Sequence, residues 1–67
     1  MTPYIINMLR QMGDAEDRAA VDTGDRLHRC AAMLYRDWAD QLEAGHSVAD
    51  LPPTGRETVA LIQEWAP

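Results

Sequence analysis

The stretch Leu27–Leu42, LHRCAAMLYRDWADQL, decides the fold of this chain. On a helical wheel its apolar residues fall within an arc of about 140°, and most of its charged residues fall on the opposite side. This is the 3.6-residue period of an amphipathic helix. The apolar arc, called the apolar stripe below, contains Leu27, Cys30, Ala31, Leu34, Tyr35, Trp38 and Leu42. We expect the rest of the chain to cover it.

The segment before Leu27 has two interpretations, which differ at Gly24. In one, a short helix ends near 22 and a second begins with Asp22 or Thr23 as its cap. In the other, one helix tolerates Gly24 at a cost of about 1 kcal/mol. The phase of Ala20 with the stripe and the (i, i+4) spacing of Asp22 and Arg26 favour the second. We predict a long central helix over 15–44 and leave a break near Gly24 open.

A short helix over 3–12 is predicted at the N-terminal end, with Thr2 as cap, Pro3 at its first position and Gly13 just past its end. Its apolar residues span an arc of about 200°, which one neighbouring helix cannot cover. Either it packs between two other helices of its own chain, or one flank is left for a partner or a second copy. That flank consists of Tyr4, Ile5, Ile6, Leu9 and Met12.

After Gly45, the segment to Pro53 is predicted to be a loop, because two consecutive prolines forbid regular helix there. Ser47 and Asp50 have the spacing that caps a single helical turn. Val48 and Leu51 are the expected apolar anchors of this loop.

The sequence Thr54-Gly55-Arg56-Glu57 matches a capping box and predicts a last helix over 55–66. The connection before it is long enough to reverse the chain, so we expect this helix to lie antiparallel along the central one. Trp38 and Trp65 are the expected aromatic anchors of the core. Together the patterns predict an all-α fold, a small three-helix bundle forming a single domain over 1–67.

Charge and composition narrow the classes of partner. The net charge is −5, from 11 acidic and 6 basic residues, and every basic residue is an arginine. A chain so acidic lacks the basic patch of a nucleic-acid or anionic-membrane binder, and it is attracted to basic protein surfaces instead. The single cysteine fits a reducing cytoplasm, and the N-terminal stretch resembles neither a signal peptide nor a membrane span.

The residues with catalytic or metal-binding chemistry are scattered. His28 and Cys30 are two positions apart, so they point to different sides of a helix, and His46 follows the predicted helix end. We expect Cys30 to pack in the core, His28 to lie at the edge of the stripe and His46 to interact with helix carbonyls. The sequence predicts no catalytic residues, no metal site and no cofactor.

The outer face of the central helix carries the remaining candidate site, which consists of Met33, Asp37, Asp40 and Glu43. One interpretation is a solvated face that keeps a small protein soluble. The other is a surface that binds a basic partner. In size and charge the chain is similar to phage-encoded inhibitors of host defence, including anti-CRISPR proteins, and to some antitoxins. We therefore expect a non-enzymatic inhibitor or regulator of a larger protein; the alternative is a self-associating helical module, with a homodimer formed through the first helix.

Overall fold

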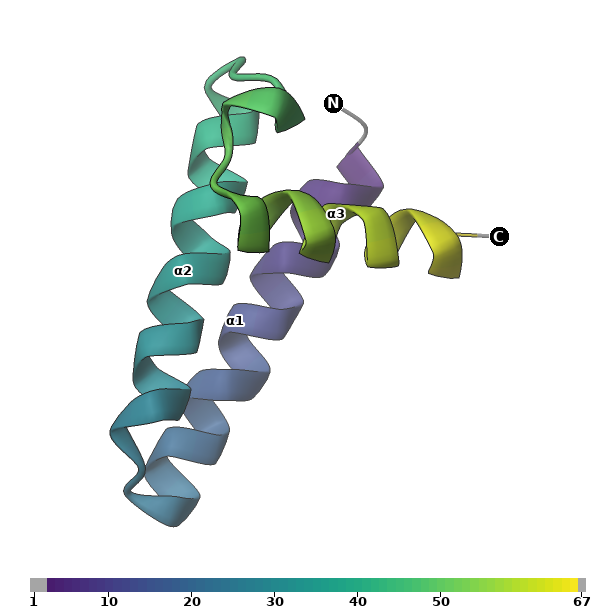
Figure 1. Cartoon of the computed structure of the whole chain (residues 1–67). Coiled ribbons are helices and arrows are strands. Elements are labelled where there is room, and N and C mark those ends of the chain that lie inside the picture. Colours follow the sequence, from purple (N-terminus) through teal and green to yellow (C-terminus); the bar gives the residue numbers. More distant parts are fainter. Residues whose placement is uncertain (1–2, 67) are drawn as a thin grey trace.

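A computed structural model describes residues 3–66. It contains the α-helices α1 (Pro3–Thr23), α2 (Arg26–Glu43) and α3 (Pro53–Trp65), with a short 3₁₀ helix, η1 (Val48–Asp50), between the last two. Figure 1 shows α1 and α2 as an antiparallel hairpin, with α3 crossing both near their upper ends. Residues 3–66 contain no strand. The predicted all-α bundle of three helices is confirmed, but the boundary between the first two helices is not where we predicted it.

The chain breaks at Gly24, so the long central helix over 15–44 is wrong and the alternative, a break near this glycine, is correct. Gly24 has a φ of +71°, in the left-handed region that favours glycine, and its N–H donates to the carbonyl of Ala20 at 2.8 Å. That alternative named the wrong cap, however: α2 is capped by Asp25 and not by Asp22 or Thr23. The Asp25 carboxylate accepts a hydrogen bond from the Leu27 N–H at 2.9 Å.

Gly13 was predicted to end the first helix, but it lies buried inside α1. A Cβ added there would stand 3.1 Å from Cγ of Arg36 and 3.4 Å from the carbonyl oxygen of Ala32, both on α2. Gly13 therefore marks a close approach of the two hairpin helices. The predicted Thr2 cap lies outside the described residues.

The loop after α2 follows the prediction. Gly45 has a φ of +103° just past the end of the helix. The Asp50 carboxylate accepts hydrogen bonds from the Ser47 N–H and hydroxyl at 3.0 and 3.3 Å, which caps η1. Leu51 is buried and Val48 packs against the core, so both serve as the expected anchors.

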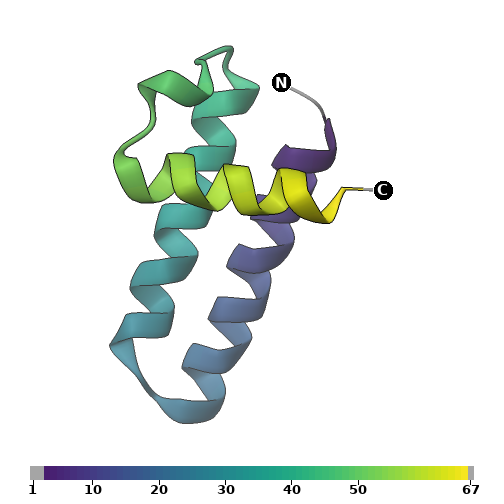
Figure 2. The same cartoon turned by 45° about the vertical axis from the view of Figure 1, so that its right-hand side comes forward.

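Helix α3 differs from the prediction in its start and its direction. It begins at Pro53, because proline already has helical φ and needs no amide partner in the first turn, and Thr54 therefore lies inside the helix instead of capping it. It crosses the hairpin rather than lying along α2, as both views show (Figures 1 and 2). Gly55 at the crossing point packs against Trp38 and Leu51.

The core lies where α3 covers the hairpin. Its buried residues come from all three helices and from the loop after η1, and they are Ile5, Leu9, Trp38, Ala39, Leu42, Leu51, Val59 and Ile62. Trp38 is the expected anchor, with its indole edge-on to Tyr35. Trp65 does not anchor the core: the last turn of α3 extends past α1 (Figure 1), and Trp65 is 53% exposed. Among residues 3–66, no helix has the length and apolar character needed to cross a membrane.

Candidate binding surfaces

The apolar stripe of α2 is only half covered. Its C-terminal half lies in the core, with Trp38 and Leu42 each 3% exposed. Its N-terminal half lies outside the core: Leu27 is 75% exposed and Leu34 48% exposed. Cys30, predicted to pack in the core, is also exposed. The expectation that the chain covers the whole stripe is therefore wrong.

The uncovered half is a direct continuation of the face that α3 covers. Leu27, Leu34 and Trp38 lie close to one line along α2, because residues seven and eleven positions apart share a helix face. Trp38 faces Gly55 of α3. Since α3 crosses only this end of the hairpin, no element within residues 3–66 covers the same face of α2 beyond it (Figure 1).

Two of the three acidic candidates on α2 are paired with an arginine of α1. The Arg10 guanidinium lies 2.7 Å from Glu43 and 3.1 Å from Asp40. Its hydrogen bonds, first to Glu43 and then to Asp40, raise the pKa of Arg10 above its ordinary value. The Asp40 and Glu43 side chains nevertheless stay 67% and 62% exposed.

A second cluster of the same kind lies further along the hairpin. Arg36 of α2 contacts Asp14 at 2.8 Å and also pairs with Asp17, and hydrogen bonds to these two carboxylates raise the pKa of Arg36. Asp14 thus reaches across to α2, rather than to Arg18 one turn along its own helix. In each cluster one guanidinium bridges two carboxylates, so each cluster has a net charge of −1.

Both clusters lie on the side of the hairpin away from α3. Arg36 and Asp40 are each two positions from Trp38, which places them on nearly the opposite side of α2 from the residue that faces α3. The remaining candidates lie beside them: Asp37 accepts a hydrogen bond from the Gln41 amide at 2.8 Å, and Met33 is 66% exposed. The predicted acidic face is thus a real exposed surface whose charge is partly neutralised.

The flank of the first helix that we predicted for self-association belongs mostly to the monomer core. Ile5 and Leu9 are 4% and 0% exposed, and Tyr4, Ile6 and Met12 are partly buried against the core. Helix α1 therefore packs between α2 and α3, as the first of its two interpretations stated. Because Ile5 and Leu9 are buried within one copy, these two residues cannot form a surface for a second.

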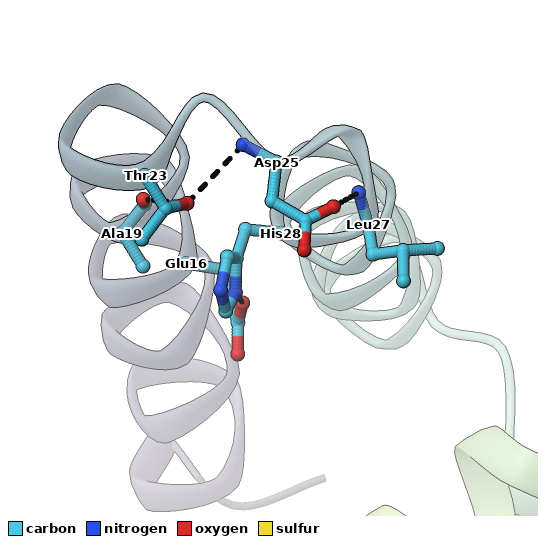
Figure 3. A network of polar contacts seen from close by, with 6 residues as sticks. All are labelled: Glu16, Ala19, Thr23, Asp25, Leu27 and His28. Carbon is cyan, nitrogen blue, oxygen red and sulfur yellow. Dashed lines mark hydrogen bonds and ion pairs between the residues drawn. The ribbon is translucent and has the colours of Figure 1, made fainter.

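His28 has a structural partner near the turn between α1 and α2. Its Nδ1 lies 2.6 Å from the Glu16 carboxylate of α1 and joins the two helices there (Figure 3). In the same view Leu27 points away from α1. His28 lies at the edge of the stripe, as expected, whereas sequence alone gave no signal for Glu16 as its partner.

The remaining candidates for catalytic or metal-binding roles do not come together in one site. The His46 backbone N–H donates to the Gln41 carbonyl, and its ring lies 3.9 Å from Asp50. Within residues 3–66, no group of three or more His, Cys, Asp or Glu side chains is placed to hold a metal ion. Comparisons of the chain with protein-family models, curated proteins and solved structures found no match.

Proposed function

We propose that this chain is a non-enzymatic binding protein that regulates or inhibits a larger protein with a basic surface. The observation that carries the proposal is the outer side of α2, where the exposed carboxylates of Asp40 and Glu43 lie on the same side of the helix as the exposed Met33. Carboxylates attract lysine and arginine side chains, and a flexible methionine makes an adaptable apolar contact.

Arg10 contributes to this surface by holding Asp40 and Glu43 in place. When Asp37 is included, the surface has three carboxylates and one guanidinium, and its net charge is −2. Carboxylates that are already ordered lose less conformational freedom when a partner binds, which favours affinity. The overall charge of −5 adds long-range attraction to a basic protein. Size and charge also support the narrower proposal of a phage-type inhibitor of host defence.

The placement of the potential catalytic groups supports a non-enzymatic role. His28 is paired with Glu16, and Cys30 lies on the exposed side of the stripe, two positions away and pointing elsewhere. A thiol–imidazole pair needs the two groups within hydrogen-bond reach of each other.

The test is capture of partners from a lysate of the native host by the immobilised chain, followed by mass spectrometry. The variant Asp37→Asn/Asp40→Asn/Glu43→Gln removes the acidic surface, and Glu57→Gln/Glu64→Gln removes exposed acids of α3 as a matched control. We expect a basic protein to be captured by the wild type and the control and lost by the triple variant, with unchanged circular dichroism. Equal capture by the triple variant would contradict the proposal.

A further inference from the structure

We propose that a second copy of this chain covers the exposed half of the apolar stripe, with the two α2 helices packed antiparallel about a two-fold axis near Ala31. Apart from Asp37, which belongs to both, this interface is separate from the acidic surface on the other side of α2. It also differs from the self-association surface predicted on the first helix, whose residues lie in or against the core of the monomer.

The exposed apolar residues are arranged symmetrically about that axis. Leu27 and Leu34 lie on one face of α2, and their midpoint falls between Cys30 and Ala31. An antiparallel second copy therefore places its Leu34 over Leu27 and its Leu27 over Leu34. The residues at the crossing point, Cys30 and Ala31, are small, which lets the two helices approach closely.

Charge complementarity selects the same register. Arg26 and Asp37 are eleven positions apart, so they lie on one flank of the stripe, and their midpoint is within one residue of the apolar one. A two-fold axis near Ala31 brings Arg26 of each copy to Asp37 of the other, and so forms two equivalent ion pairs. Within residues 3–66, neither Arg26 nor Asp37 makes an ion pair, and Asp37 accepts its hydrogen bond from the neutral Gln41 amide.

The position of α3 is compatible with this packing. It contacts α2 at Trp38 and leaves exposed the side chains of Leu27 and Leu34 on the stripe and of Arg26 and Asp37 on its flank. These side chains are also the ones that the antiparallel partner presents. In Figure 1, α3 crosses the end of the hairpin opposite the turn between α1 and α2, so the antiparallel arrangement puts the second copy's own α3 beyond that turn of the first hairpin. Each copy leaves uncovered the length of α2 that the other copy needs.

Analytical ultracentrifugation of the full chain over a range of concentrations tests the proposal. We expect a concentration-dependent dimer for the wild type and a monomer for Leu34→Asp and for Leu27→Asp. Both substituted side chains are exposed in the monomer, so both variants should fold, with unchanged circular dichroism. Val21→Asp is the matched control: Val21 is 79% exposed but lies on α1, away from the stripe, and this variant should dimerise like the wild type.

Charge reversal tests the register. Arg26→Asp and Asp37→Arg should each weaken the dimer about tenfold, because each places like charges together at two symmetric sites. The double variant should restore dimerisation, since it exchanges the signs of the pair. A strict monomer at every concentration, a dimer that survives Leu34→Asp, or a double reversal that fails to restore association would each overturn the proposal.

Discussion

Gly55 of α3 lies against the indole of Trp38 on α2, so closely that a Cβ added to Gly55 would stand 3.1 Å from Cε2 of the ring. The same Cβ would lie 3.2 Å from Cβ of Leu51. Trp38 and Leu51 are both buried, and Leu51 directly follows η1. This contact fixes where α3 crosses the hairpin, and thereby decides which half of the apolar stripe is covered.

Gly55→Ala should therefore destabilise the fold, although alanine is the better helix former. Overpacking against rigid neighbours costs about 1–3 kcal/mol, which exceeds the gain in helix propensity of about 1 kcal/mol. Urea denaturation followed by circular dichroism measures the difference in the free energy of unfolding.

Gly13→Ala is the matched control, because Gly13 is also a buried glycine inside a helix. Its added Cβ would meet the side chain of Arg36, which is flexible and 40% exposed. We expect a change within about 1 kcal/mol of the wild type. Equal destabilisation by both substitutions would show that the rigidity of Trp38 and Leu51 is not the cause.

Gly24→Ala should destabilise the hairpin by about 1 kcal/mol, because a Cβ is disfavoured at positive φ even though the surrounding space is open. Gly24→Asn should cost less, since asparagine tolerates the left-handed region better than alanine does. Thermal unfolding of the two variants gives the comparison. If Gly24→Ala raises the melting temperature, α1 and α2 form one continuous helix and the hairpin is wrong.

Asp25→Ala removes the cap of α2 and should cost about 1 kcal/mol of stability, because the Leu27 N–H loses its acceptor. Asp25→Asn keeps a side-chain acceptor and should stay close to the wild type. Chemical denaturation of both variants distinguishes the lost cap from the lost charge. A loss of the same size in Asp25→Asn would assign the effect to charge.

These positions show why the sequence predicts three helices correctly but divides them at the wrong place. A glycine ends a helix where φ is positive and permits close packing where two helices meet, and sequence alone does not distinguish these roles. Gly24 ends α1 and Gly13 lies buried inside it, whereas the prediction placed Gly13 at a helix end and Gly24 inside a helix. The i+4 spacing of Asp22 and Arg26 favours a continuous helix. The residue that starts the second helix is Asp25, which lies between them and caps α2.

The amphipathic period predicts a face of α2 correctly but does not show how far along the helix a neighbour covers it. Cover depends on the direction of α3, which is set by the contact of Gly55 with Trp38 and by the start of the helix at Pro53. The acidic candidates on α2 follow from the pattern. The pairing of Asp40 and Glu43 with Arg10 does not, because it joins residues far apart in the sequence.

The two tryptophans should respond differently to truncation. Trp38→Ala removes a buried anchor and should cost about 3–5 kcal/mol, enough to unfold much of a chain this small. Trp65→Ala should cost less than about 1 kcal/mol, because this side chain is half exposed. Circular dichroism and urea denaturation measure both. A Trp65→Ala variant as unstable as Trp38→Ala would contradict the placement of α3.

The apolar stripe lies half inside and half outside the core, and the reactivity of the Cys30 thiol reports directly on the outer half. The measurement is the rate of Cys30 alkylation by N-ethylmaleimide as a function of protein concentration, with Cys30→Ala/Ala39→Cys as a buried control. We predict fast alkylation of Cys30 in dilute protein, slower alkylation as a second copy covers the stripe, and protection of the buried thiol in the control variant throughout. Protection of Cys30 at every concentration, with alkylation limited by global unfolding, would contradict the account.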